Sequence, residues 1–435
     1  MRLTPEEQGM LAGEQGRATQ RAMEIIVTLG HIYEAERLLD VSSVQVAGVS
    51  YRNLGEAGLE FLRDWAAEGA RVRVPTTLNP AGMDLVRWQH MGISQEYARK
   101  QLETIEVYAA MGIQPTCTCA PYLVGNVPGY GKHIAWSESS AVVYANSVLG
   151  ARTNREGGPS ALAAAICGRT AEYGLHCDAN RRATLRVEVR CAVCGLDEYA
   201  ALGYLVGRDV GGGVPYFVGL SMAPLDAGSA DVPQEGTSQD ALRTQDALKL
   251  LGAALASSGA VALYHVQGVT PEACIEGVRP GVDLCPCGIP RLVIESLEPA
   301  ITALNASVES IDLVVIGCPH ASLEELRQVA TLITARSPRG QRLVSDLWVT
   351  MPRQVREQGE ALGLVQVIEE AGGQVIADGC VVVAPMQELP YHTLATNSAK
   401  MASYALPHAG LQVRFGSLER CIDAAVTGCW PTHQP

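Results

Sequence analysis

Residues 311–336 read IDLVVIGCPHASLEELRQVATLITAR. The opening apolar run, 311–317, is typical of a buried strand, and the apolar spacing of 322–336 predicts a helix. Cys318 stands between the two, at the carboxyl end of the predicted strand. Ligands bind outside this end of the strands in parallel α/β sheets, so the stretch predicts both a fold and the edge where a site would lie.

The same alternation of strand-like and helix-like segments runs along most of the chain. Strands are predicted over 43–50, 71–78, 184–193, 261–266 and 374–385. Helices are predicted over 53–69, with Asn53 as its N-cap, and over 94–112 and 158–174. This pattern is typical of an α/β fold with mainly parallel sheets.

The length and one loop-like segment predict how the chain is divided. A chain of 435 residues exceeds the usual size of one hydrophobic core, so we expect two or three α/β lobes. Residues 222–243 are rich in Gly, Pro, Ser and Asp, which predicts a loop or linker. We therefore expect the first lobe or lobes over 1–221 and another over 244–435.

Composition and charge exclude several classes of protein. Hydrophobic residues make up 47% of the chain and charged residues 18%, which is typical of a folded globular protein. A net charge of −13 argues against nucleic acid or an anionic membrane as the main partner. The N-terminus has no apolar signal-peptide core, and no apolar stretch approaches membrane-spanning length, so we expect a cytoplasmic protein.

Thirteen cysteines, an odd number, argue against a disulfide framework in a chain without an export signal. Cys119 and Cys318 lie at the ends of predicted strands, and Cys380 lies in an apolar segment that could reach the same edge. Three converging thiolates could hold an iron–sulfur cluster with one iron open to substrate. Their spacing alone equally fits buried core thiols.

A zinc site is an alternative interpretation of the compact cysteine pairs. Cys191 and Cys194 are spaced C-x₂-C, whereas Cys285 and Cys287 are spaced C-x-C. Zinc ribbons show two C-x₂-C pairs on turns, and no histidine stands close to these four residues. The pattern therefore favours the cluster over zinc.

Four segments carry a resemblance to a known family: PTCTCAPYLVGNVPGYGKHIAWSESSAVVYANSVLGARTNREGGPSALAAAICGRTAEYGLH (115–176), VIGCPHASLEEL (315–326), IADGCVVVAP (376–385) and TNSAKMASYAL (396–406). Together they resemble the catalytic (large) subunit of the aconitase X family over nearly the whole chain. The resemblance implies an aconitase-like core of α/β lobes around a cluster-containing cleft. It also implies a hydro-lyase that removes water from a small hydroxy acid.

The resemblance implies that Cys119, Cys318 and Cys380 hold the iron–sulfur cluster, with Cys117 as an alternative to Cys119. A [4Fe–4S] cluster is favoured, and a [2Fe–2S] cluster is the alternative. The family usually has a threonine before the third cysteine, where this chain has Gly379. A hydroxyl beside the cluster is thereby lost, which is expected to alter its redox tuning.

The resemblance also implies a substrate-binding set: Gly48, Val49, Ser50, Asn79, Pro80, Glu138, Ser139 and Lys400, with Glu138 and Ser139 as catalytic residues. The residues agree with an anion site, because 48–50 offer N–H groups after a strand and a predicted helix begins near Glu138. Taken singly, each residue also fits an ordinary strand end, helix acid or solvated lysine.

Three further residues are candidates from their positions. Arg152 and Arg155 could clamp a carboxylate, or they could pin their own loop. His320 follows a predicted cluster ligand and could support it or serve as a cap.

The resemblance predicts the partner, and the composition predicts the substrate. The resemblance implies a small swivel subunit that supplies a catalytic serine, and no swivel domain is recognised in this chain. Composition rich in Ala and Arg favours cis-3-hydroxy-L-proline as substrate, with (R)-5-phosphomevalonate as the alternative. Interpretations from another class are a non-catalytic α/β binding protein and a zinc-binding scaffold.

Overall fold

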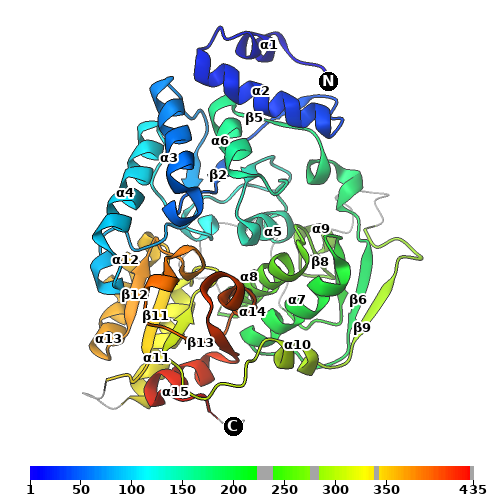
Figure 1. Ribbon diagram of the computed structural model, residues 1–435. Helices are drawn as coiled ribbons and strands as arrows, with labels where there is room; N and C mark the ends of the chain where they lie inside the picture. Colours follow the sequence, from blue (N-terminus) through cyan, green and yellow to red (C-terminus); the bar gives the residue numbers. More distant parts are fainter. Residues whose placement is uncertain (223–238, 275–283, 338–341, 432–435) are drawn as a thin grey trace.

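The computed structural model describes residues 1–222, 239–274, 284–337 and 342–431 (Figure 1). Its strands form four sheets, and every strand pair is parallel except β1 with β5. The expected α/β fold with mainly parallel sheets is therefore confirmed.

The N-terminal region is built on a three-stranded sheet in the order β3-β2-β4. Its strands are β2 (Val44–Val46), β3 (Thr76–Leu78) and β4 (Ala135–Trp136), and β1 (Leu38–Asp40) pairs with β5 (Arg169–Ala171) nearby. Its helices are α1 (Pro5–Leu11), α2 (Arg17–Ile32), α3 (Tyr51–Ala67), α4 (Gln95–Ala110), α5 (Ser139–Ser147) and α6 (Gly158–Cys167). Apolar residues of α2, α3, α4 and α6 pack with those of β2 into one core.

The middle region is built on a four-stranded sheet in the order β8-β7-β6-β9. Its elements are β6 (Leu185–Val189), α7 (Leu196–Val210), β7 (Pro215–Val218), α8 (Gln239–Gly259), β8 (His265–Val266), α9 (Pro271–Cys274), β9 (Arg291–Ile294) and α10 (Glu298–Ala303). Two of the four strands precede the segment 222–243 and two follow it. The segment thus connects strands of one sheet, and the division into lobes at this place stays a prediction.

Most of the predicted linker 222–243 lies outside the described residues, and its last part is helical. Helix α8 begins at Gln239 and packs along α7. The two backbones approach closely, since a Cβ at Gly203 of α7 would lie 2.4 Å from the carbonyl oxygen of Leu251. Glycine is required there because no side chain fits between the helices.

The C-terminal region is a five-stranded sheet in the order β12-β11-β10-β13-β14. Its strands are β10 (Leu313–Ile316), β11 (Asp346–Met351), β12 (Gln374–Ala377), β13 (Thr393–Thr396) and β14 (Gln412–Phe415). Its helices are α11 (Leu323–Arg336), α12 (Arg353–Ala361), α13 (Leu364–Glu370), α14 (Ala399–Tyr404) and α15 (Leu418–Thr427).

Helices cover both faces of this sheet, which explains why its strands are continuous apolar runs. Val314 and Ile316 of β10 pack with residues of α11, α13 and α15. Leu313 and Val315 point to the other face and pack with residues of α7, α8 and α14. Figure 1 shows the middle helices beside the sheet in this arrangement. The sheet is therefore fixed firmly, and the loops at its ends have a rigid base.

The predicted N-cap of one helix is wrong. Helix α3 begins at Tyr51 with Ser50 as N-cap, two residues earlier than the predicted start at Asn53. The helix is also kinked at Gly55, which has a φ of +63°. A left-handed glycine has no steric penalty, so the helix turns there before it continues along the core. None of the described helices is long and apolar enough to cross a membrane.

Candidate active site

The carboxyl ends of two parallel sheets meet at one place. Strands β2, β3 and β4 lead into 48–50, Asn79 and Glu138, and strands β10, β12 and β13 lead into Cys318, Cys380 and the turn before Lys400. Backbone hydrogen bonds join the two edges, from Ala81 N to Asp378 O (2.9 Å) and from Cys380 N to Ala81 O (3.1 Å). Residues far apart in the chain are thereby gathered at one junction, as expected for an α/β ligand site.

An ion pair between Glu138 and Lys400 crosses this junction. Lys400 Nζ donates to Glu138 Oε1 at 2.5 Å and to Ser140 Oγ at 3.2 Å. Asn79 Nδ2 donates to the other carboxylate oxygen of Glu138 at 2.9 Å, and Ser139 Oγ donates to Oε1 at 3.2 Å. Four of the predicted site residues, from three segments, are therefore joined through one carboxylate.

The charges of this pair are fixed by its surroundings. Burial alone would raise the pKa of Glu138, but the charge of Lys400 and the hydrogen bonds from Lys400 and Asn79 lower it to about 2. Burial alone would lower the pKa of Lys400, but the charge of Glu138 outweighs it and raises the pKa. Glu138 is thus an ionised carboxylate and a weak base in this arrangement. It holds Lys400 charged beside the cysteines.

Cys119, Cys318 and Cys380 are brought together beside Lys400. Burial raises the pKa of each thiol, and the charge of Lys400 is the largest influence that opposes this rise. A negative charge on Cys380 would further raise the pKa of the other two thiols, which places all three within electrostatic range of one another. All three are free of disulfides. Two buried thiols and one half-buried thiol that face one fixed positive charge suit a group that stabilises thiolates.

Cys117 and Cys119 lie in different surroundings. Cys119 Sγ accepts a hydrogen bond from the His320 backbone N–H at 3.1 Å, and its charge neighbours are Lys400, Glu138 and Cys380. Cys117 packs in the core of the N-terminal region, and none of Lys400, Cys318 and Cys380 influences its pKa. The geometry therefore supports Cys119 as the residue that joins Cys318 and Cys380.

His320 ties the three cysteine segments together. Its backbone N–H reaches Cys119 Sγ, its Nε2 lies 2.9 Å from the carbonyl oxygen of Gly379, and its Nδ1 lies 3.0 Å from Thr118 Oγ1. The carbonyl oxygen can only accept, so Nε2 carries the proton and Nδ1 accepts from the Thr118 hydroxyl. Burial lowers the pKa of His320 to about 4, which keeps the ring neutral. His320 therefore braces the cysteine loops.

Gly379 lies very close to the backbone of the loop 81–84 at the same junction. A Cβ at this position would lie 2.9 Å from the backbone carbonyl carbon of Met83 and 3.1 Å from the backbone nitrogen of Asp84. A larger residue here would push the loop 81–84 away. The glycine found in place of a threonine thus matches a loop packed directly against the third cysteine segment.

The predicted anion-binding residues 48–50 form the turn into α3. Gly48 has a φ of +82°, and Ser50 Oγ donates to the carbonyl oxygen of Val383 at 2.7 Å, three residues after Cys380. Helix α6 begins beside them, because a Cβ at Gly158 would lie 2.7 Å from Ala47 O and 4.0 Å from Gly48 N. Neither α3 nor α6 has an acidic residue in its first turn, which favours an anion at both N-termini, and Glu156 just before the N-cap of α6 accepts a hydrogen bond from Ser160 Oγ at 2.6 Å.

The two candidate arginines have different roles. Arg152 is buried, forms an ion pair with Asp178 and donates to the carbonyl oxygen of His176 at 3.1 Å. Arg155 is exposed, and its guanidinium has no hydrogen bond or ion pair with the described residues. Arg152 thus pins its own loop, and Arg155 remains available two residues before the N-cap of α6.

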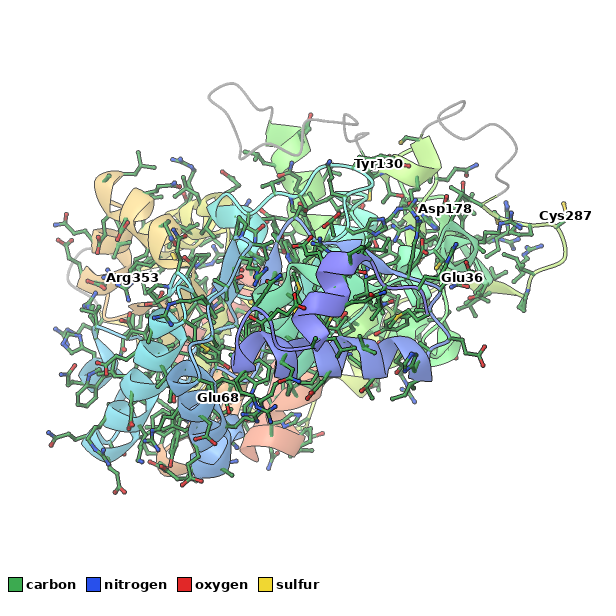
Figure 2. The ribbon with its side chains drawn as sticks, turned by 90° about the horizontal axis from the view of Figure 1, so that it is seen from above. Glu36, Glu68, Tyr130, Asp178, Cys287 and Arg353 are labelled. Carbon is green, nitrogen blue, oxygen red and sulfur yellow. The ribbon has the colours of Figure 1, made fainter. Side chains whose placement is uncertain are left out.

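The described residues contain no zinc site. The part of the chain that the structure describes has no group of three or more Cys, His, Asp or Glu side chains placed to hold a single metal ion. Cys194 and Cys287 are exposed, and Figure 2 shows Cys287 pointing outward at the periphery. The same finding is compatible with a cluster at Cys119, Cys318 and Cys380. Sulfurs on one zinc ion lie about 4 Å apart, whereas cluster cysteines bind different irons and lie farther apart.

Sequence reasoning missed several residues of the site. Ser140, Thr118 and Ser398 contact Lys400, His320 and the carbonyl oxygen of Cys318, respectively. Ser140 directly follows the predicted site residue Ser139, Ser398 stands two residues before Lys400, and Thr118 lies between the two candidate cysteines. Their closeness in the sequence to those predicted site residues was the signal that could have found them.

Family models describe nearly all of the chain. They match the first, second and third domains of aconitase X over residues 1–179, 183–282 and 311–427. The chain belongs to the aconitase X family. A solved structure of Thermococcus kodakaraensis aconitase X in its holo form has a TM-score of 0.85 and 44% identity, covering 98% of this chain and all of that one.

Relatives of this aconitase X chain are dehydratases. It is 50% identical to the phosphomevalonate dehydratase large subunit of Methanothermobacter thermautotrophicus, covering 93% of this chain and 94% of that protein. It is 37% identical to the cis-3-hydroxy-L-proline dehydratase of Pseudomonas aeruginosa, covering all of this chain and 71% of that protein. The chain is therefore a hydro-lyase and a dehydratase large subunit, and the binding-protein and zinc-scaffold interpretations are not supported.

The comparisons do not favour the first expectation about substrate. Relatives named for phosphomevalonate include those at 42 to 50% identity, whereas those named for cis-3-hydroxy-L-proline are at 36 to 37%. The alternative, phosphomevalonate, is supported better. Composition was a poor guide because it carries no information about which groups line the site.

Proposed function

We propose that this chain is the large subunit of an iron–sulfur dehydratase acting on (R)-5-phosphomevalonate. The observation that carries the proposal is the convergence of Cys119, Cys318 and Cys380 on the Lys400–Glu138 pair. The higher identity to phosphomevalonate dehydratase large subunits, along nearly their whole length, supports the substrate.

Cys119, Cys318 and Cys380 are the proposed ligands, and [4Fe–4S] is the favoured cluster over [2Fe–2S]. The donor set fits, since the three thiols are free of disulfides and lie close to a fixed positive charge, with Cys119 and Cys318 buried and Cys380 half-buried. Aconitase-type dehydratases generally use such a cluster. When bound, it would supply a Lewis-acidic iron that helps a hydroxyl group leave.

The substrate carries a carboxylate and a phosphate on either side of its tertiary hydroxyl group, and the chain offers two separate cationic regions for them. Lys400 is held charged by Glu138 at the cysteines, where it can bind the carboxylate or the hydroxyl. Gly48 and Ser50 begin a turn flanked by the N-termini of α3 and α6, and Arg155, two residues before the N-cap of α6, has no side-chain partner among the described residues. Backbone N–H groups, helix N-termini and an arginine form a set suited to phosphate. Hydroxyproline has no second anionic group that would occupy this second region.

The roles of the remaining residues follow from their contacts. Asn79, Pro80 and Val49 are proposed to line the substrate, and Asn79 Oδ1 is a buried acceptor without a partner, ready for a substrate hydroxyl. Ser139 is proposed to orient Glu138. Glu138 is too acidic to take a proton at neutral pH while paired with Lys400, so its proposed role is orientation.

A small swivel subunit is the proposed partner, and a proton acceptor is expected from it. The relatives named as large subunits support a separately encoded partner. The partner would close over the junction where 48–50, Asn79 and Lys400 meet.

The deciding experiment compares both substrates on one preparation. The chain is reconstituted anaerobically with iron and sulfide, mixed with its small subunit, and assayed for dehydration of (R)-5-phosphomevalonate and cis-3-hydroxy-L-proline. We expect turnover of the first with a kcat/KM at least about a hundredfold higher, since losing a charged contact costs about 1.5–3 kcal/mol and a phosphate has several. Turnover of hydroxyproline alone would overturn the substrate assignment. Full activity without the small subunit would overturn the partner assignment.

A further inference from the structure

The segment before Cys380 contains a backbone conformation that needs support. Asp378 has a φ of +62°, in the left-handed region that non-glycine residues rarely adopt. It links the end of β12 to Gly379 and Cys380, and it is buried. The direction in which Cys380 leaves the sheet therefore depends on what holds Asp378.

Arg353 holds Asp378 by a two-point contact. Its Nε donates to Asp378 Oδ2 at 2.9 Å, and its terminal NH2 group forms an ion pair with the same oxygen. Arg353 is the first residue of α12, directly after β11, so the sheet delivers it to the same edge as the turn it supports. The planar guanidinium can make both contacts at once, which a lysine cannot.

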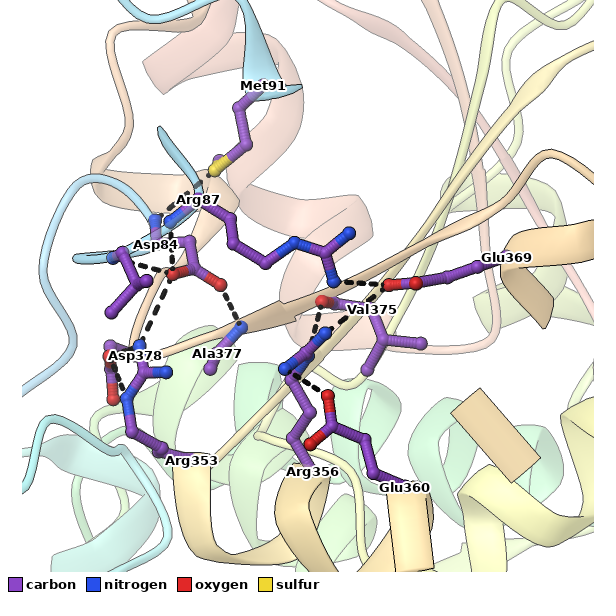
Figure 3. A network of polar contacts seen from close by, with 11 residues as sticks. Asp84, Arg87, Met91, Arg353, Arg356, Glu360, Glu369, Val375, Ala377 and Asp378 are labelled. Atoms are coloured by element: carbon purple, nitrogen blue, oxygen red, sulfur yellow. Dashed lines mark hydrogen bonds and ion pairs between the residues drawn. The ribbon is translucent and has the colours of Figure 1, made fainter. Parts of the chain in front are cut away.

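The same guanidinium reaches a second loop. The NH2 group of Arg353 lies 3.3 Å from Oδ1 of Asp84, a residue of the loop that follows Asn79 and Pro80. Asp84 Oδ2 accepts from the backbone N–H of Ala377 at 3.0 Å, and Oδ1 accepts from two N–H groups of its own loop. Figure 3 shows Arg353 between the two carboxylates.

Backbone contacts complete the link between the loops. Ala81 N donates to Asp378 O, and Cys380 N donates to Ala81 O. The loop carrying Asn79 and the loop carrying Cys380 therefore move as one unit only while Arg353 neutralises both aspartates. Without it, two buried carboxylates would face each other without a cation.

We infer that Arg353 is a positioning residue that holds the Cys380 ligand loop and the Asn79 substrate loop in register. The expected effect of Arg353 on the cluster rests on the proposed function, whereas its role in positioning the two loops does not. It predicts that loss of the guanidinium loosens Cys380 more than Cys119 and Cys318, because Arg353 contacts Asp378 beside Cys380, and the His320 bond to the Gly379 carbonyl would then hold that loop without the ion pair.

The first test measures thiol exposure on the full chain without cluster. Wild type, Arg353→Gln and the control Arg87→Gln are alkylated under reducing conditions, and the labelling rate of each cysteine is followed by peptide mass spectrometry. Arg87 is a matched control, because its side chain is similarly exposed and pairs with Glu369 instead of the aspartates. We expect Cys380 in Arg353→Gln to label at least about fivefold faster relative to Cys119. Equal ratios in the three proteins would overturn the inference.

The second test measures iron retention on anaerobically reconstituted protein. We expect Arg353→Gln to release iron to a ferrous chelator at least about fivefold faster than wild type and Arg87→Gln. Adding Asp378→Gly should restore slow release, because glycine adopts the left-handed turn freely and removes one unpaired carboxylate. Absence of this rescue would also count against the inference.

The two tests separate the inference from the proposed function. If wild type binds no iron but Cys380 labels faster in the variant, the cluster assignment fails and the positioning role stands. If wild type binds iron and the variant behaves identically in both tests, only the positioning role fails. Should Arg353→Gln not fold, Asp84→Asn breaks the same link with less disturbance and is expected to accelerate Cys380 labelling in the same direction.

Discussion

The Nζ atom of Lys400 lies 2.5 Å from the Oε1 atom of Glu138, although the two residues are 262 positions apart. Lys400 comes from the C-terminal sheet region and Glu138 from the N-terminal one. The pair therefore joins the two halves of the site, and it sets the charge that faces the cysteines.

Glu138→Gln should destabilise the chain in a pH-dependent way. The folded-state pKa of Glu138 is about 2 against an ordinary value of 4.5, so the ionised carboxylate favours the folded state above pH 4.5. That contribution, ~3 kcal/mol by pKa difference, is lost as the pH falls from 4.5 to 2. Urea unfolding at several pH values should show the wild type more stable at pH 7 and the gap closing in acid. A gap that is the same at pH 7 and pH 2.5 would contradict the ion-pair explanation.

Alanine variants of the cysteines should divide into two groups. Cys119→Ala, Cys318→Ala and Cys380→Ala are expected to lose the brown colour and most of the iron after reconstitution, because each removes one proposed ligand. Cys117→Ala should keep both, since its thiol lies in the core. Iron and sulfide analysis with visible spectra makes the measurement. Loss of colour in the Cys117 variant alone would reverse the ligand assignment.

His320→Ala should weaken iron retention without removing a ligand. The change deletes the bonds to Gly379 and Thr118 and leaves the backbone N–H to Cys119 intact. We expect the iron content after reconstitution to approach that of wild type and the release rate to a chelator to rise severalfold. His320→Gln can keep the bond to the Gly379 carbonyl and should fall between the two. Identical release from all three proteins would show that the brace is unimportant.

Arg155→Gln should raise the KM for phosphomevalonate more than it lowers kcat. A charged hydrogen bond to phosphate contributes about 1.5–3 kcal/mol, so a tenfold or larger loss of kcat/KM is expected. Arg155→Lys should retain part of it, because the charge stays while the two-point contact is lost. Steady-state kinetics with the small subunit present gives the measurement. Unchanged KM in Arg155→Gln would place the phosphate elsewhere.

Sequence patterns predicted the individual helices and strands well. They predicted only in part which residues meet where the two sheets join. The apolar run before Cys318 and the helix after it are β10 and α11, within a residue or two of the predicted bounds. Their success has a physical reason, since a doubly covered parallel strand must be apolar at every position. The cap of α3 was misplaced because Ser50 and Asn53 are both good capping residues, and only the packing of the turn selects between them.

Long-range pairings left no local signal. Nothing near Arg353 in the sequence indicates that its partners are Asp84 and Asp378, and the strand order β12-β11-β10-β13-β14 does not follow from chain order. Cys117 and Cys119 could not be separated for a similar reason, because the choice depends on which of them faces His320, about 200 residues away.

The close packing of α7 against α8 bears on how the chain could be divided. Their backbones touch at Gly203, and the four-stranded sheet takes strands from both sides of residues 223–238. Removing that segment would leave a helix pair and a sheet shared between the two fragments. Co-expressed halves, 1–222 and 239–435, should therefore reassociate, which would make this enzyme a split reporter whose colour depends on fragment complementation.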